Sequence, residues 1–340
     1  MSSETKILKK SSVQKLIEIL ASANIRLMAP QKKGAALIFA ETKSASEISY
    51  DHIQTDLSAK SVLFPQTEEI LSYSYAGRDV NMKEREAESF PELVLFGARP
   101  CESSAIGLLN AVFTWDTQDV FFKTRLAKTT VITIGCKKFD EYCFCTSVGC
   151  SPADKRFSDI FMTPVSDEEF YVESLTKKGD DLIKRAAAVF TMANKTIDVE
   201  KELAKVPVLF DIDALNKKLP DLFNRVEIWK EQSLRCLGCG ACAYACPACA
   251  CFDIQDESGK EGGKRLRCWD SCGFSTFTLH TSGHNPRHIQ AERWRQRVMH
   301  KFSYFKDRLK SIACVGCGRC SRNCPVDMNL SEHLKSLMEA

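Results

Sequence analysis

The feature that most constrains this chain is a cysteine motif that occurs twice. Residues 236–247 read CLGCGACAYACP and residues 314–325 read CVGCGRCSRNCP, so both copies follow the pattern C-x2-C-x2-C-x3-C-P. In this pattern the first three cysteines of one copy bind one [4Fe–4S] cluster, and the fourth cysteine binds the cluster of the other copy. The sequence therefore predicts two clusters that tie the two copies into one unit.

The predicted ligand sets follow from this exchange of the fourth cysteine. The set for cluster 1 is Cys236, Cys239, Cys242 and Cys324, and the set for cluster 2 is Cys314, Cys317, Cys320 and Cys246. Structural zinc is the alternative, but zinc sites usually pair two C-x2-C units rather than two triplets that each have a fourth Cys-Pro. We expect the glycines between these cysteines to let the backbone approach the inorganic sulfides.

Cysteine is also the outlier in the composition, with 17 in 340 residues, all from Cys101 onward. The 44% apolar and 27% charged content is typical of a soluble globular protein. No run approaches the roughly 18 apolar residues of a membrane span, and the N-terminus lacks the apolar stretch of a secretory signal. We therefore expect a cytoplasmic protein, in which clustered cysteines favour metal or redox sites over disulfides.

Composition divides the chain into three regions. We expect an α/β domain with a parallel or mixed sheet over 1–185, a helical connector over 186–230, and a mainly helical two-cluster ferredoxin-like domain over 231–340. Apolar spacing predicts helices over 12–23, 65–74 and 101–113, and strands over 35–41, 92–98 and 129–135. The unit from Glu92 to Gly135 is then strand, helix and strand, which predicts a parallel pair.

A second cysteine group follows these two predicted strands. Cys101 comes after the strand at 92–98 and Cys136 after the strand at 129–135, so both thiols would emerge at the carboxyl edge of one sheet. Cys143 and Cys145, in C-x-C spacing, could complete a four-thiolate site. Spacing alone leaves two alternatives open: buried free thiols, and Cys150 in place of Cys145.

The segment between the two motifs is basic. Residues 285–310 contain eight Lys or Arg and two acidic residues. A solvated amphipathic helix is the first interpretation, and a docking surface for an acidic electron-transfer partner is the second. Nucleic-acid binding is third, because no aromatic-glycine motif accompanies the charge. We also hypothesise that Arg235, Arg319 and Arg322 raise the reduction potentials of nearby clusters.

Several longer stretches resemble one family. They are GARPCESSAIGLL (97–109), IGCKKFDEYCFCTSVG (134–149), CLGCGACAYACPACACFD (236–253), CWDSCGF with SGHNPR (268–287), and CVGCGRCSRNCP (314–325). In order and spacing they resemble the ferredoxin-bearing electron-transfer subunits of soluble anaerobic reductases. That group includes the ferredoxin-type subunit of anaerobic sulfite reductase and the beta subunits of cytoplasmic NiFe sulfhydrogenases.

The resemblance implies a subunit with no substrate site of its own. It would relay electrons between a flavin and [2Fe–2S] subunit that handles NAD(P)H and a catalytic reductase or hydrogenase subunit. The resemblance also implies a third [4Fe–4S] cluster, on Cys101, Cys136, Cys143 and Cys145. We therefore expect a non-catalytic subunit of an oxidoreductase complex of anaerobic metabolism, without a membrane or nucleic-acid partner.

Five cysteines remain outside these sets: Cys150, Cys249, Cys251, Cys268 and Cys272. The last four could in principle close a further cluster. Such a site would need Cys268, which has no counterpart in the family pattern, so we do not expect it.

The alternative function is an oxidoreductase that is catalytic in its own right and binds a flavin or a substrate in its α/β region. The sequence offers it little support, because it has neither a G-x-G-x-x-G after a predicted strand nor a P-loop.

Overall fold

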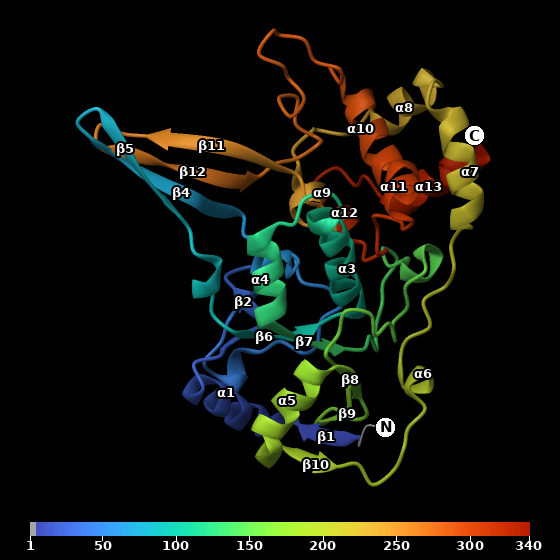
Figure 1. Cartoon of the computed structure of the whole chain (residues 1–340). Helices are drawn as coiled ribbons and strands as arrows, with labels where there is room; N and C mark the ends of the chain where they lie inside the picture. The colour runs from blue at the N-terminus through green and yellow to red at the C-terminus, as the bar shows by residue number, and fades with distance from the viewer. Residues whose placement is uncertain (1–4) are drawn as a thin grey trace.

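The computed structural model describes residues 5–340, with a sheet-rich part at one end, a largely helical part at the other, and a small sheet that projects from the side (Figure 1). The strands are β1 (Lys6–Lys9), β2 (Arg26–Lys33), β3 (Ala36–Glu41), β4 (Thr67–Ala76), β5 (Asp79–Glu84), β6 (Leu93–Ala98), β7 (Thr129–Ile134), β8 (Ile160–Pro164), β9 (Glu169–Ser174), β10 (Phe190–Met192), β11 (Phe252–Ser258) and β12 (Gly262–Trp269). The helices are α1 (Val13–Ser22), α2 (Lys60–Leu63), α3 (Pro100–Thr114), α4 (Val120–Lys128), α5 (Lys177–Arg185), α6 (Val199–Glu202), α7 (Ile212–Leu222), α8 (Val226–Ser233), α9 (Ala241–Tyr244), α10 (Gln290–Met299), α11 (Phe305–Leu309), α12 (Arg319–Arg322) and α13 (Leu330–Glu339).

The large sheet is mixed, as the sequence predicts. Its strand order is β10-β1-β9-β8-β7-β6-β2-β3, with a parallel centre of β2, β6, β7 and β8 and antiparallel strands on both sides. The predicted parallel pair is confirmed, because β6 and β7 are neighbours with Leu93 opposite Thr129. The sheet also takes in β10, which lies beyond residue 185.

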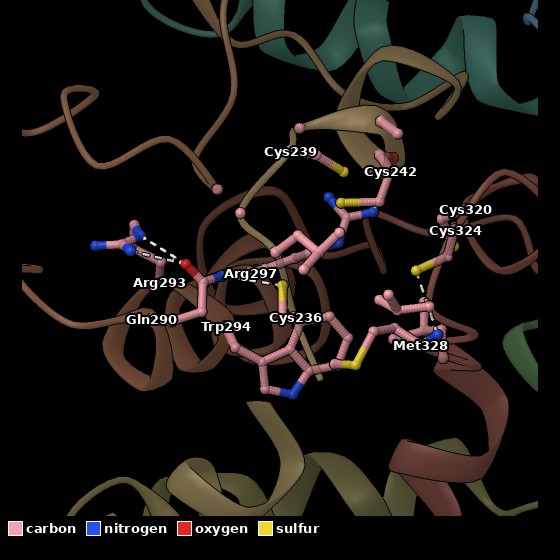
Figure 2. A pocket seen from close by; sticks show the side chains of 17 residues that line it. Cys236, Cys239, Cys242, Gln290, Arg293, Trp294, Arg297, Cys320, Cys324 and Met328 are labelled. Atoms are coloured by element: carbon pink, nitrogen blue, oxygen red, sulfur yellow. Dashed lines mark hydrogen bonds between the residues drawn. The ribbon is translucent and has the colours of Figure 1, made fainter. Parts of the chain in front are cut away.

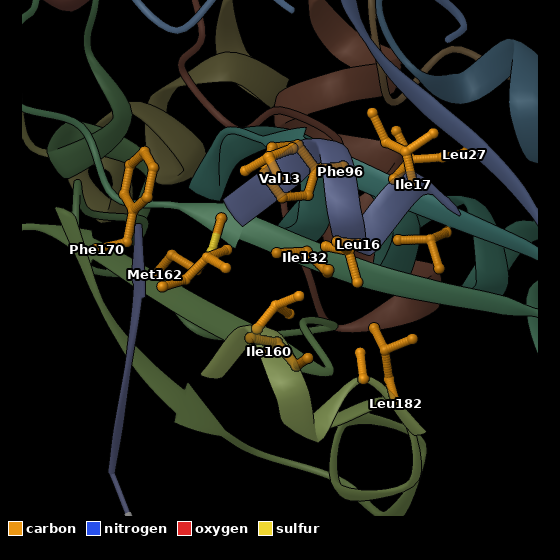
Figure 3. Packing of buried hydrophobic residues seen from close by; sticks show 14 of the residues in the cluster. Val13, Leu16, Ile17, Leu27, Phe96, Ile132, Ile160, Met162, Phe170 and Leu182 are labelled. Atoms are coloured by element: carbon orange, nitrogen blue, oxygen red, sulfur yellow. The ribbon is translucent and has the colours of Figure 1, made fainter. Parts of the chain in front are cut away.

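Helices cover both faces of this sheet. On one face α1 and α5 pack with strand residues such as Phe96, Ile132 and Met162 (Figure 3). On the other face α3 and α4 pack against Leu95 and Val131, which alternate with Phe96 and Ile132 along their strands. The period of two along each strand thus serves two cores, and a site is expected at the carboxyl ends of the central strands.

The predicted helix over 65–74 is wrong, because this segment forms strand β4. Leu71, Tyr73 and Tyr75 alternate with serines, which is the strand period, and β4 pairs with β5 and with the distant β12. Glu68 at its start is buried and forms ion pairs with Arg125 and Arg267. The strand β4 is therefore held by the neighbouring β5 and by β12, which lies almost two hundred residues further along the chain.

The C-terminal part is helical around the buried Trp229 and Trp294, with α7, α8, α10 and α13 in one core. It is not helical throughout, because β11 and β12 form a hairpin that joins β4 and β5 in a second sheet of order β11-β12-β4-β5. Between α10 and α11, residues 300–304 form a π-helix. No helix within residues 5–340 has both the length and the apolar character to cross a bilayer.

Candidate iron–sulfur sites

A small cavity lies between the two copies of the cysteine motif (Figure 2). The cysteines that line it are Cys236, Cys239, Cys242, Cys324 and Cys320. The structure thus brings together all four ligands that the sequence predicts for cluster 1, together with one ligand that it predicts for cluster 2.

Hydrogen-bond donors face two sulfurs of this cavity. Gln290 donates from Nε2 to Cys236 Sγ at 3.0 Å, and the amide of Met328 donates to Cys324 Sγ at 3.3 Å (Figure 2). Arg293 donates to Oε1 of Gln290 at 2.7 Å and so fixes the orientation of its amide. Donors to ligand sulfurs stabilise negative charge and raise the reduction potential of a cluster.

Lys301 lies beside Cys246 of the second predicted set and beside Ala313, which directly precedes Cys314 of the same set. Its Nζ lies 3.5 Å from Cys246 Sγ and donates to the carbonyl of Ala313 at 2.8 Å. Burial alone would lower the pKa of Lys301, but interactions with Cys246, Cys249 and Cys314 raise it above its usual value. Lys301 therefore faces thiols from both copies of the motif.

The third set meets at the carboxyl edge of the large sheet. A small cavity is lined by the thiols that follow β6 and β7 and by the C-x-C pair, and these are Cys101, Cys136, Cys143 and Cys145. Gln54 donates from Nε2 to Cys101 Sγ at 2.9 Å, and Arg322 donates to Cys143 Sγ at 3.2 Å. The sequence placed Cys101 and Cys136 at one edge of the sheet, and in the structure both thiols line one cavity with Cys143 and Cys145.

Cys150 lies outside this cavity's lining. Arg156 donates to Cys150 Sγ at 3.1 Å and also pairs with Asp154, which ties the thiol to its own turn. Spacing alone leaves the choice between Cys145 and Cys150 open, and the geometry favours Cys145.

The three sets lie in a row. Cys320 lines the cavity of the first set, and Cys317 lines the cavity of the third, so the loop of the second set stands between them. Cys239 is exposed at one end of the row, whereas Cys101 is buried at the other.

Burial raises the pKa of Cys242, Cys314 and Cys145 to about 12 in each case. Such thiols hold their protons at neutral pH unless a metal takes the place of the proton. Within residues 5–340, no three His, Cys, Asp or Glu side chains converge on one point as they would around a single metal ion. Thiolates that each bind a different iron of a cubane are not expected to converge in that way.

The glycines of the second motif serve backbone packing in this structure. At Gly316, with φ +62°, a Cβ atom would lie 2.5 Å from the backbone of Cys145, and at Gly318 it would lie 2.5 Å from the carbonyl of Tyr142. The amide of Phe144 donates to the carbonyl of Gly316 at 2.9 Å. These glycines therefore let the second set approach the third.

We expect Gly316→Ala to destabilise the protein by more than the roughly 1–3 kcal/mol of a left-handed backbone alone, because the new methyl group also meets fixed backbone. Gly149→Ala is the matched control, since Gly149 has φ +75° and open space around it. Urea denaturation under anaerobic conditions measures both variants. Equal losses in the two would show that the close approach at Gly316 contributes nothing.

Three buried cations surround the first two sets: Lys60, Arg297 and Lys301, each at most 5% exposed. None of them forms an ion pair with a carboxylate in residues 5–340. Burying an ion without a counter-charge costs several kcal/mol, so these cations favour a negatively charged group beside them. Thiolates that bind iron supply this negative charge, and neutral thiols do not. Sequence reasoning missed these three residues, although the i, i+4 spacing of Arg297 and Lys301 puts both on one helix face.

Residues 235–328 match the family described as a 4Fe-4S dicluster domain. Over 320 residues the chain is 30% identical to the sulfhydrogenase 2 subunit beta of Pyrococcus furiosus, and the alignment covers 92% of each protein. It is also 23% identical over 168 residues to the F420-dependent formate dehydrogenase subunit beta of Methanocaldococcus jannaschii. That match covers 47% of this chain and 36% of the relative.

Proposed function

The chain belongs to the family of the sulfhydrogenase beta subunits, and on this premise we propose that it relays electrons between a flavin and [2Fe–2S] subunit that oxidises NAD(P)H and a catalytic reductase or hydrogenase subunit. The predictions of an iron–sulfur electron-transfer subunit of an oxidoreductase complex and of [4Fe–4S] cofactors are confirmed by the relatives and by the dicluster match. The identity of the partners and a cytoplasmic location belong to the proposal.

The observation that carries the proposal is the row of three cysteine sets. We assign cluster 1 to Cys236, Cys239, Cys242 and Cys324, cluster 2 to Cys314, Cys317, Cys320 and Cys246, and cluster 3 to Cys101, Cys136, Cys143 and Cys145. Bound [4Fe–4S] clusters would supply one-electron transfer with little rearrangement. The chain's own residues fix the spacing of the sets, shield them from water and place cations beside their sulfurs.

The exposed end of the row is suited to contact with a partner subunit. Beside the exposed Cys239, Leu237 is 67% exposed and Leu234 is 81% exposed. Apolar side chains at this exposure next to a redox site are typical of a surface that another subunit covers. We assign this end to one of the two partners.

A spectroscopic comparison tests the relay. In the purified complex, NAD(P)H should reduce the clusters of this chain, and EPR should detect them. The isolated chain should be reduced by dithionite but should not oxidise NAD(P)H. Turnover of NAD(P)H by the isolated chain would favour the alternative of an oxidoreductase that is catalytic in its own right.

Iron analysis tests the third set. We expect Cys136→Ser to lose iron from this set, because Cys136 lines its cavity, whereas Cys150→Ser should keep the wild-type iron content. Both variants remove one thiol from the same region, so a general loss of fold would affect them alike. Unchanged iron in Cys136→Ser would remove cluster 3 from the proposal.

A further inference from the structure

Strand β5 is an open edge of the small projecting sheet. The strand order β11-β12-β4-β5 places it at the end of this sheet, and in the part of the chain that the structure describes it pairs with β4 alone (Figure 1). All six of its residues are exposed. An exposed edge strand carries unpaired amides and carbonyls, and it is therefore a template for one more strand.

The backbone groups of β5 alternate between β4 and this open side. The amide of Arg85, directly after the strand, donates to the carbonyl of Ile70 on β4 at 3.0 Å. The two strands pair in one unbroken register, so every second residue before Arg85 also turns its backbone groups toward β4. The residues between these, Val80 and Met82, therefore point their amides and carbonyls out of the sheet.

The sequence of this edge, DVNMKE, is complementary to itself when two copies run antiparallel about Asn81. In that register Val80 lies opposite Met82 of the second copy, so the outward amides and carbonyls of the two copies meet. Asp79 lies opposite Lys83 of the second copy, and two-fold symmetry forms each contact twice. The next register that matches outward groups sets Val80 opposite Glu84, which places an apolar side chain beside a carboxylate.

The charges distinguish this edge from the opposite edge of the same sheet. Asp79 and Lys83 form no ion pair within residues 5–340, so both charges are free to pair with a second copy. Strand β11 at the opposite edge reads FDIQDES, with three acidic residues and no basic one. Two copies of β11 would set like charges side by side, which disfavours their pairing.

The same register joins two exposed apolar faces. Across the β4–β5 pair Tyr75 lies opposite Val80 and Tyr73 opposite Met82, so these four side chains share one face of the sheet. Val80 is 53% exposed and Met82 is 72% exposed. Pairing would lay Val80 of each copy beside Met82 of the other, and the two apolar faces would become one. Cross-strand contacts of this kind stabilise a sheet.

We propose that β5 pairs antiparallel with β5 of a second copy of this chain, about a two-fold axis at Asn81, and joins the two projecting four-stranded sheets into one. The pairing goes beyond the proposed relay, because every cysteine lies at or after Cys101, outside β4 and β5. A strand of six residues makes a small interface, so we expect a weak dimer.

Sedimentation equilibrium of the full chain, purified anaerobically, tests the pairing. Wild type should pass from monomer to dimer as its concentration rises. Asp79→Lys should raise the dissociation constant of the dimer by about tenfold or more, because both symmetric contacts become repulsive. Lys83→Asp should have the same effect. Asp79→Lys/Lys83→Asp exchanges the two charges and should restore the association of wild type, which a general loss of fold would not do.

Lys260→Asp is the matched control, because it changes the net charge as Lys83→Asp does but lies in the exposed turn between β11 and β12. Its dissociation constant should equal that of wild type. A wild-type chain that stays monomeric up to about 1 mM would overturn the pairing. A dimer that neither charge reversal weakens, or that the charge exchange does not restore, would also overturn it, because the contact would then lie elsewhere. A wild type without iron that still dimerises in this way would contradict the cluster assignments and support the pairing.

Discussion

Replacing Glu102 by leucine is expected to destabilise the protein by about 3–5 kcal/mol, because it leaves a buried arginine without its counter-charge. Glu102 forms an ion pair with Arg319, and the two residues are 3% and 1% exposed. Arg319 also donates to the carbonyl of Thr55 at 2.9 Å, and Glu102 accepts from the amide of Ala59 at 2.8 Å. One ion pair thus joins the second cysteine motif to the start of α3, beside Cys101.

Anaerobic urea denaturation followed by tryptophan fluorescence measures the loss. Removing both charges in Glu102→Leu/Arg319→Met should recover much of the stability, since neither ion is then left alone. The exposed pair Arg26–Glu41 is the control, and Glu41→Gln should cost no more than about 1 kcal/mol. A loss in Glu102→Leu as small as in this control would contradict the buried-pair argument.

Replacing Lys301 by methionine is expected to lower the reduction potential of cluster 2. The Nζ of Lys301 is buried 3.5 Å from Cys246 Sγ, and its charge stabilises the more negative, reduced state. A unit charge about 5 Å away at an effective dielectric constant of about 20 contributes roughly 3 kcal/mol. With about 59 mV for each tenfold change in a one-electron equilibrium, the shift is on the order of 100 mV.

Redox titration followed by EPR measures this shift, and a purely structural role of Lys301 would leave the potentials in place. Lys306→Met is the matched control, because Lys306 is in the following helix α11 and pairs with Asp213 at 2.7 Å near the surface. We expect its cluster potentials to match wild type. Equal potentials in Lys301→Met and wild type would exclude Lys301 as a tuning residue.

The cysteine sets could be predicted from the sequence because their spacing is local. Each triplet spans seven residues, and Cys101 and Cys136 follow strands whose parallel pairing is a general rule for such units. Spacing did not decide between Cys145 and Cys150. The resemblance implied Cys145, and the structure adds that Arg156 donates to Cys150 Sγ, a contact that spacing cannot reveal.

The charges around the sets could not be predicted in the same way. The sequence hypothesis named Arg319 and Arg322 as tuning residues, but these pair with Glu102 and Asp140, so much of their charge is balanced. The cations without carboxylate partners include Lys60, which contacts the ferredoxin-like region from a helix almost two hundred residues earlier. The strand β4 is a different case: the alternation of Leu71, Tyr73 and Tyr75 with serines is a local strand signal that the prediction overlooked, and only its partner β12 lies far along the chain.

The cavity between the two motif copies has a consequence for biosynthesis. Its walls include Cys236 at one end and Cys324, Met328 and Leu330 at the other, with a whole hairpin and helix α10 between them in the chain. A nascent chain on the ribosome cannot form this cavity until the last of these residues has emerged. Iron–sulfur delivery to this set must therefore wait until Leu330 has emerged, and until then the cell has to keep the thiols of the first motif reduced.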